Sequence, residues 1–402
     1  MNLKFTCIKE DSGVQICLHN SVHQINENDW NTCNFKNNIY LSIPYLSAIE
    51  NSMSHEVEFR YIQFYSKENT AIGSAIVQVL KVEEQFENHE DIFCKVKTVV
   101  KQKLLNTINA KVLVCGNLFS CGENGFAFIP EIDRTAAISL LNNAFKYIKD
   151  NESVNDNQVS YYLMKEFWPD TAEESKRHFE KHNFRELEID ANMLMPIHSN
   201  WSSFEDYLES MTTKFRTKAK STFKKSAALQ VVDFSANDIR ENSKKIEKLF
   251  ANVVNQSEFN LCDLTADAFA QLKENLARNF VFRAYKLNDK IVGFSTATVL
   301  YSVALEANYV GLDYTINKEY AVYQRMLYDM IDMAIEKNLE TIYFGRTAEE
   351  LKSTLGAQPA KMKLYIRHRN TLSNQILKPV IASIKPTEFE LRNPFKAAFT
   401  FA

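Results

Sequence analysis

Hydrophobic and polar positions follow the same plan in two stretches that lie about half a chain apart. The first joins the aromatic-rich run 59–65, through polar residues 66–69, to Ala71-Ile72-Gly73-Ser74-Ala75-Ile76-Val77. The second joins residues 282–286, through Asn288-Asp289, to Ile291-Val292-Gly293-Phe294-Ser295-Thr296-Ala297. Each pattern predicts a β-hairpin that enters its second strand through a glycine. Because the chain has only nine glycines, this repetition indicates a duplicated domain.

The elements predicted after each hairpin also repeat. Short apolar runs predict strands, and apolar residues at helical spacing predict helices. In the first half these are strand 111–115, helix 135–149, strand 159–164, helix 173–182 and strand 184–194. In the second half they are strand 303–313, helix 320–337, strand 341–344, helix 349–355 and strand 362–367. The common order is hairpin, strand, helix, strand, helix, strand, in an α/β fold.

The two copies differ in their additions. Helices are predicted over 204–225, 242–255 and from Thr265 to about 278 ahead of the second hairpin, with Thr265 as N-cap. In the first half residues 20–55 would supply such helices, and Asp133 is the predicted N-cap of helix 135–149. The first copy carries an insertion near 82–109. We therefore expect domains at 1–197 and 198–402, a linker at 196–201 and a tail at 371–402.

Composition sets limits on the class of protein. Hydrophobic residues make up 45% of the 402 residues, with 28 Phe and 17 Tyr, which is enough for two large cores. The net charge of −3 excludes a globally basic DNA-binding protein. No apolar run reaches the length of a transmembrane helix, and the first residues do not form a secretory signal. The sequence also has no nucleophile-elbow, zinc-protease or P-loop motif.

The seven cysteines are scattered and form no C-x-x-C pair. This pattern predicts reduced thiols in the cytoplasm. Cys115 and Cys121 flank a turn, but no histidine or further cysteine lies close to them in sequence. We interpret them as buried or partly buried free thiols and expect no metal site.

The order of elements resembles the GNAT acyltransferase fold, and a tandem pair resembles the FemAB-like and BioF2-like transferases of bacteria. Three segments between about 200 and 370 carry the resemblance: Tyr207 to Arg216 leading into a lysine-rich helix, Asp313-Tyr314 before a tyrosine-rich helix, and Phe344-Gly345-Arg346 with Lys352 and Gly356. It implies two GNAT-like domains, each a mixed central sheet flanked by helices. The C-terminal domain is the one expected to be active.

The resemblance implies an N-acyltransferase that moves an acyl or aminoacyl group from an activated donor to an amine. Its co-substrate would be an acyl-CoA or other acyl thioester, with no tightly bound cofactor. Two alternatives stay open: a FemAB-type transferase that uses aminoacyl-tRNA, and a non-catalytic GNAT-like binding module. The coiled-coil arm common in peptidoglycan-bridge enzymes is missing, which disfavours the first alternative.

The same resemblance assigns the turn after strand 303–313 to donor binding, because a helix N-terminus offers free N–H groups to phosphates. Its residues would be Tyr314, Asn317, Gln324 and Arg325. The turn contains no glycine, unlike the pyrophosphate loop of ordinary acetyl-CoA-dependent GNATs, so CoA is not assumed. Arg325 also has a simpler interpretation, a pair with Asp329 four residues on.

Candidate catalytic residues follow from the need for a neutral amine. A carboxylate must accept the amine proton, and Asp313 at the strand end is our first choice, with Glu306 on the same strand second. Tyr320 or Tyr323 would protonate the leaving group. Tyrosines on helices are more often packing residues, and this alternative applies to both.

The remaining candidates lie around the cleft. Tyr309, Phe344, Arg346 and Lys352 would line it, although Gly345 and Gly356 can equally serve turn geometry alone. A basic run without acidic residues spans the predicted helix after Met211: Lys214, Arg216, Lys218, Lys220, Lys224 and Lys225. It would bind a polyanion or form an ordinary solvated face, while Phe215, Ala219 and Phe223 face the core.

Expected partners are a small-molecule, lipid or cell-wall-precursor amine, together with tRNA or acyl carrier protein as candidate donors. A peripheral contact with an anionic membrane surface is compatible with the basic run. The sequence does not choose among these partners.

Overall fold

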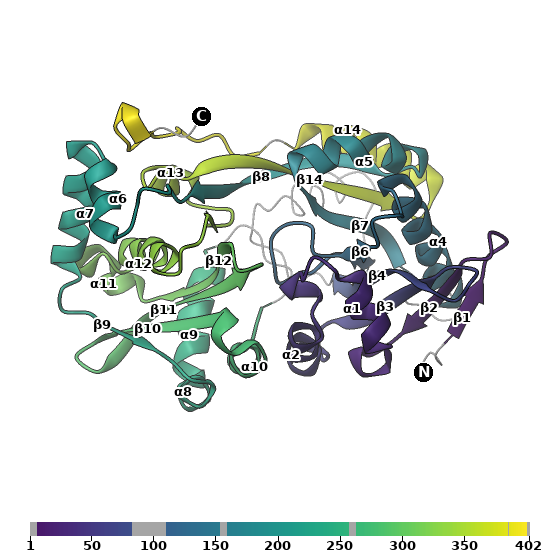
Figure 1. The fold of residues 1–402 in the computed structure, drawn as a ribbon, viewed down its shortest axis with the longest axis horizontal. Helices are drawn as coiled ribbons and strands as arrows, with labels where there is room; N and C mark the ends of the chain where they lie inside the picture. Colours follow the sequence, from purple (N-terminus) through teal and green to yellow (C-terminus); the bar gives the residue numbers. More distant parts are fainter. Residues whose placement is uncertain (1–5, 83–109, 153–158, 257–262, 385, 400–402) are drawn as a thin grey trace. The chain divides into compact units, whose positions relative to one another are not determined.

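The computed structural model describes residues 6–82, 110–152, 159–256, 263–384 and 386–399 (Figure 1). These residues form two compact units. Unit 1 takes its described residues from 1–189 and 361–386, and unit 2 takes its own from 190–256, 263–360 and 387–399. The insertion predicted near 82–109 lies almost entirely outside the described residues.

Unit 1 is a mixed sheet with helices on both faces. Its elements are β1 (Thr6–Lys9), β2 (Gln15–His19), α1 (Glu27–Cys33), α2 (Ile43–Met53), β3 (Glu58–Tyr65), β4 (Ala71–Val82), β5 (Ala110–Cys115), β6 (Phe126–Phe128), α4 (Arg134–Glu152), β7 (Val159–Phe167), α5 (Pro169–Lys181), β14 (Gln358–His368) and α14 (Thr371–Ser383). The strand order is β1-β2-β3-β4-β5-β7-β14, and β6 also pairs with β4. Only β5 and β7 run parallel among the pairs of this order.

Unit 2 repeats this plan. Its elements are β8 (Arg185–Pro196), α6 (Phe204–Ser210), α7 (Thr213–Lys225), β9 (Gln230–Asp233), α8 (Ala236–Glu241), α9 (Ser243–Val254), α10 (Ala266–Leu276), β10 (Phe280–Leu287), β11 (Lys290–Leu300), β12 (Ala304–Leu312), α11 (Tyr314–Tyr320), α12 (Val322–Glu336), β13 (Thr341–Tyr343) and α13 (Glu349–Ser353). The strand order is β8-β13-β12-β11-β10-β9, with β12 and β13 parallel. The predicted tandem α/β architecture is confirmed.

The two predicted hairpins have matching irregularities. Gly73 lies opposite Phe64 and Gly293 opposite Tyr285, and in each hairpin the register shifts at the next residue. Packing also disfavours a side chain at both positions. A Cβ at Gly73 would lie 2.2 Å from the Phe128 ring, and one at Gly293 would lie 2.5 Å from Met326 of α12. The repeated glycines therefore mark a shared bulge at which the sheet is approached closely.

Two predicted helices are interrupted. The helix expected over 204–225 divides into α6 and α7 because Met211 has extended backbone and forms a β-bridge with Phe395. The helix expected from Tyr320 begins at Val322, after a separate short helix α11. The predicted N-caps hold: Asp133 Oδ1 accepts the Ala136 N–H at 2.7 Å, and Thr265 Oγ1 accepts the Ala268 N–H at 3.1 Å.

Part of the closing strand predicted for each half lies in the other unit. Residues 194–196 of β8 pair with Thr341–Tyr343 inside unit 2, whereas residues 363–368 of β14 pair with β7 inside unit 1. In Figure 1 the yellow-green arrow of β14 lies beside the blue arrow of β7. The observed boundary falls at 189/190, and residues 361–386, predicted as part of the second domain, belong to unit 1. A prediction that divides the chain at one point cannot place β14 in the same unit as β7, because the two strands lie almost 200 residues apart.

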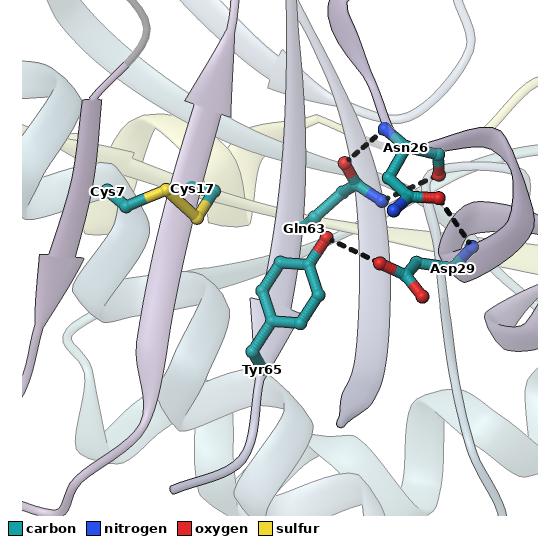
Figure 2. Close-up of a disulfide and its surroundings, with 6 residues drawn as sticks. All are labelled: Cys7, Cys17, Asn26, Asp29, Gln63 and Tyr65. Atoms are coloured by element: carbon teal, nitrogen blue, oxygen red, sulfur yellow. Dashed lines mark hydrogen bonds between the residues drawn. A yellow bond between two sulfur atoms is a disulfide. The ribbon is translucent and has the colours of Figure 1, made fainter. Parts of the chain in front are cut away.

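One expectation about the cysteines is wrong. Cys7 on β1 and Cys17 on β2 form a disulfide, and Figure 2 shows the bond crossing between the two strands. The antiparallel register places these two residues directly opposite each other, so the pairing depends on strand register rather than on sequence spacing. Cys115 and Cys121 carry free thiols, as predicted.

Candidate functional site

The sheet of unit 2 opens where β13 leaves β12. The two strands pair only from Ala304↔Thr341 to Glu306↔Tyr343, after which β13 ends and β12 continues to Leu312. The register of β12 with β11 also changes here, from Ala297↔Ala307 to Ser295↔Val310. Asn308 and Tyr309 thus lie opposite the single residue Thr296, which is a β-bulge. The bulge on the β11 side of β12 follows shortly after Glu306, the last residue of β12 that pairs with β13.

Hydrogen bonds fix the bulge. Thr296 Oγ1 accepts the Tyr309 N–H at 3.0 Å, and the Thr298 hydroxyl donates to Asn308 Oδ1 at 2.7 Å. The Tyr309 ring packs against Phe250 and Phe269, with ring centroids 5.8 and 5.5 Å away. Tyr309 is therefore anchored among aromatic side chains of the helices that cover β12.

Glu306 is a buried acid at the base of the opening. It is only 3% exposed and lies opposite Thr298 on β11 and Tyr343 on β13. Burial, followed by the nearby charge of Glu306, raises the pKa of Tyr343. A carboxylate rarely occupies such a position without a specific role or partner, so Glu306 is the acidic group best placed for chemistry here.

Asp313, the first-choice base, has a structural task instead. Its carboxylate caps α11 by accepting the Thr315 N–H at 3.1 Å and the Thr315 hydroxyl at 2.6 Å. These bonds, together with the charges of Lys245 and Lys248, lower the pKa of Asp313. Because the cap holds the Asp313 carboxylate and a lowered pKa makes it a weaker base, Asp313 is less suited to accept the amine proton.

The glycine-free turn is built as a helix. Residues 314–320 form α11, and Ala321 then adopts a left-handed conformation (φ 50°) immediately before α12. Asn317 Oδ1 accepts the Tyr323 N–H at 2.9 Å and so satisfies one of the free donors at the start of α12. The predicted donor residue Asn317 therefore serves as a helix cap, and Tyr314 lies on the exposed side of α11 with 39% of its surface accessible.

Tyr323 is suited to donate a proton. Burial, with smaller contributions from Tyr314 and Glu349, raises the pKa of Tyr323 to about 12. Its hydroxyl therefore stays protonated at any physiological pH. Tyr320 packs partly buried against Val322 and Leu312, in the manner of an amphipathic packing residue.

Gln324 and Arg325, the next two residues of α12, have different environments. Arg325 pairs with Asp329 (Nε–Oδ1 2.6 Å) and stacks over Phe223, 4.9 Å from the ring centroid, so the pairing interpretation is confirmed. Tyr285 also donates to Asp329, at 2.9 Å, which links α12 to β10. Gln324 has a buried Oε1 with no hydrogen-bond partner in the described part of the chain.

The wall opposite β12 is the turn after β13. Phe344 is buried. Three residues of the turn that follows it have positive φ: Gly345, Thr347 and Ala348. The ammonium of Lys352, itself 3% exposed, donates to the carbonyl oxygens of Arg346 (2.7 Å) and Gly345 (3.3 Å). Lys352 thus holds this turn in place, and strained backbone of this kind is concentrated at functional sites.

Asn192, which sequence reasoning missed, completes the same wall. Its Oδ1 accepts the Gly345 N–H at 3.0 Å, while its Nδ2 is buried without a partner in the described part of the chain. Such a donor costs about 1–3 kcal/mol when left unsatisfied. No sequence signal pointed to Asn192, because it lies on β8, in the half of the chain assigned to the other domain.

The basic run lies on α7 as predicted. Phe215 and Ala219 face the core, Phe223 is half-buried, and Arg216 is half-buried beside the exposed lysines 214, 218, 220, 224 and 225. An ion pair links Lys220 to Glu205, at 3.7 Å between exposed groups, and such a pair contributes little. The face therefore keeps a net positive charge.

In unit 1, buried side chains occupy the position that corresponds to Gly345 of unit 2. Glu166 and Gly345 each follow the last parallel strand pair by two residues, and both have positive φ. In unit 1 this position holds a buried ion pair, Lys165–Glu166, at 3.3 Å. The Lys165 ammonium donates to the carbonyls of Asn117 and Ser120, and Glu166 accepts the Gly122 N–H at 2.9 Å. In unit 1 the loop 116–125 thus packs against the position that corresponds to Gly345.

No group of three or more histidine, cysteine, aspartate or glutamate side chains suitable for a metal ion occurs among the described residues. Within the same residues, no helix has both the length and the apolar character needed to span a bilayer.

The two units, each with its opened or closed parallel strand pair, form a tandem GNAT-like fold. No protein-family model and no curated protein matches the sequence. Among solved structures, FemX is similar over 88% of this chain and 98% of its own, with 11% identity and a TM-score of 0.56. A tandem GNAT protein from the clavulanic acid biosynthesis pathway matches over 89% and 99%, with 7% identity and a TM-score of 0.52. At these identities the likeness establishes the fold.

Proposed function

We propose that unit 2 is an N-acyltransferase that moves an acyl or aminoacyl group from an activated donor to an amine. The observation that carries this proposal is the divergence of β12 from β13 with the buried carboxylate of Glu306 at its base. Such a cleft can admit an extended donor and hold a base beside its reactive carbonyl. The tandem GNAT-like fold supports the same class of reaction by analogy.

The transfer is a direct attack in one site. Glu306 accepts a proton from the ammonium form of the acceptor, and the neutral nitrogen attacks the carbonyl carbon of the donor. A C–N bond forms and the C–S bond of a thioester breaks. The leaving sulfur takes the proton of the Tyr323 hydroxyl, and the second proton lost by the attacking nitrogen restores that hydroxyl, so charge and atoms balance.

The donor is proposed to be an acyl thioester, of CoA or of a carrier protein. The exposed lysines of α7 can bind its phosphates by charge. The start of α12 contains no glycine and is capped by Asn317. We therefore propose that the donor phosphates bind elsewhere than at the usual pyrophosphate loop. Aminoacyl-tRNA is the second candidate, because the same basic face suits a nucleic-acid backbone. We propose an amine of a small metabolite, lipid or cell-wall precursor as the acceptor and the cytoplasm as the location of the reaction.

The first experiment is binding. Purified protein is mixed with acetyl-CoA, longer acyl-CoAs, acyl carrier protein or aminoacyl-tRNA, and the unfolding temperature is measured for each. We expect one thioester donor to raise it. If no donor does so, the binding-module alternative is favoured instead.

Turnover with the donor so identified then tests the base. Glu306→Gln is expected to lower kcat by about 10²–10⁴-fold while donor binding is kept, because a carboxamide cannot accept the amine proton. Asp313→Asn is the matched control, since asparagine caps helices as well as aspartate. Equal losses in both variants would contradict the assignment of Glu306.

A further inference from the structure

We propose that Asn192 is a further catalytic residue, whose Nδ2 donates a hydrogen bond to the acyl carbonyl oxygen of the donor. This inference rests on the proposed function and extends it to the oxygen on which negative charge develops. Asn192 lies on the part of β8 that belongs to unit 2, and it reaches the turn after β13.

The orientation of the Asn192 side chain is fixed by backbone hydrogen bonds. Its Oδ1 accepts the Gly345 N–H at 3.0 Å, the neighbouring Met193 N–H donates to the Gly345 carbonyl at 3.1 Å, and the Phe344 N–H donates to the Met193 carbonyl at 2.8 Å. Because the oxygen of the amide is committed to an N–H, its other end must be the NH₂ group. That group is the one without a partner, in a side chain that is 1% exposed.

Gly345 provides room beside this donor. A Cβ built on Gly345 would meet no heavy atom within 4 Å, although the residue itself is buried. At Gly311 on β12, by contrast, a Cβ would lie 2.1 Å from the Phe294 ring, and at Gly73 it would lie 2.2 Å from Phe128. Among the described glycines Gly345 alone has such open space. Among the described residues, the missing side chain therefore leaves a hollow at Gly345, whose N–H is bound by Asn192 Oδ1.

The groups around the hollow select an oxygen rather than a cation. Asn192 Nδ2 can only donate, and the Lys352 ammonium lies 3.3 Å from the Gly345 carbonyl oxygen. An N–H donor beside a positive charge suits a carbonyl oxygen that becomes an oxyanion as the amine attacks. The C=O bond becomes a C–O⁻ single bond in the tetrahedral intermediate, and it re-forms when the C–S bond breaks. Asn192 and Lys352 supply no atom to the product.

The test separates donation by Nδ2 from support of the turn by Oδ1. Asn192→Asp keeps an acceptor for the Gly345 N–H and removes the donor, whereas Asn192→Ala removes both. We expect Asn192→Asp to lower kcat by about 10²–10³-fold with little change in donor binding. Asn142→Asp is the matched control in unit 1. Asn142 is also buried, has an Oδ1 that accepts from Arg367 at 2.7 Å, and has an unpartnered Nδ2.

A spectroscopic measurement gives an outcome that does not depend on turnover. Acetyl-CoA labelled with ¹³C at its carbonyl is bound to each protein, and the infrared stretching band of the carbonyl is recorded. Wild type and Asn142→Asp should shift the band to lower frequency, and Asn192→Asp and Asn192→Ala should not. If acetyl-CoA binds and the band is the same in all four proteins, the role of Asn192 is overturned while the proposed function survives. If neither a thioester donor nor aminoacyl-tRNA binds, the proposed function fails, and this inference fails with it.

Discussion

Single side chains decide which of the candidate residues can act in chemistry. Two acids lie on or next to β12, but Asp313 is committed to a helix cap and Glu306 is buried where the strands diverge. Two tyrosines lie near the start of α12, and burial raises the pKa of one of them, Tyr323, to about 12. The residue types could be predicted from the sequence, whereas their hydrogen-bond commitments could not, because these depend on a turn that folds as the extra helix α11.

Tyr323 gives the first residue-scale prediction. Tyr323→Phe should lower kcat by about 10², at the lower end of the usual range for proton transfer, because a thiolate is already a good leaving group. Since the raised pKa favours the neutral hydroxyl, Tyr323 remains a donor up to about pH 10. The alkaline limb of the pH–kcat profile should therefore be identical in wild type and variant. A variant with unchanged kcat would exclude Tyr323 as the acid.

Asp313 gives the second, on stability. Asp313→Ala should lower the free energy of unfolding by about 0.5–2 kcal/mol, and Asp313→Asn should lower it less at pH 7, because asparagine keeps the cap and loses only the charge. Because the pKa of Asp313 is lowered by folding, its contribution is present above the unfolded pKa, near 3.9, and is lost as the pH falls through the folded value. Denaturant unfolding between pH 3 and 6 measures this. Identical pH dependence in wild type and Asp313→Asn would argue against the effect.

Elements show where sequence patterns are sufficient and where they fail. The period-two pattern around Gly73 and Gly293 was enough to find both hairpins, since it reflects local alternation and a turn. The disulfide between β1 and β2 was missed because register is set by pairing, which no local pattern states. The bulge at Asn308 and Tyr309 was missed for the same reason, and with it the opening of the cleft.

The disulfide at the edge of the unit 1 sheet leads to a prediction for the hairpin β1–β2. Cys7→Ser should loosen β1, because closing a loop of about ten residues restricts the unfolded chain by up to about 3 kcal/mol. Amide hydrogen exchange of β1 and β2 should accelerate in the variant, and equally in wild type treated with a dithiol. Cys121→Ser, which removes a free thiol, is the control and should leave the exchange of both strands unchanged. Equal exchange in Cys7→Ser and wild type would show that the bond contributes nothing.

For the whole molecule, the two copies keep one architecture and differ in what occupies the strand ends. The tandem plan could be predicted from the sequence because the order of helices and strands survives divergence. The contrast between the buried Lys165–Glu166 pair and Gly345 could not be predicted, because a glycine and a glutamate share no sequence signal. Both positions are nevertheless held in the same left-handed backbone, which only a structure reveals.

The assignment of β14 and α14 to unit 1 predicts how fragments behave. A fragment of residues 1–197 lacks the strand that pairs with β7 and the α14 side chains, including Leu377 and Ile381, that cover Val112 and Val114. It should therefore show no cooperative unfolding and should aggregate. Residues 1–189 joined to 361–386 through a Gly/Ser linker should regain a cooperative transition in circular dichroism. Cooperative unfolding of 1–197 alone would contradict this.

The placement of β14 has a consequence for synthesis on the ribosome. When β7 emerges, its edge partner is still roughly 200 residues from being made, which takes about 10–40 s at about 5–20 residues per second. During that interval the nascent chain presents an open strand edge and uncovered apolar side chains, features that invite wrong pairing. Codon usage and chaperone capture between these two points of translation should thus influence the yield of native protein more strongly than they do for a protein whose domains are completed one after the other.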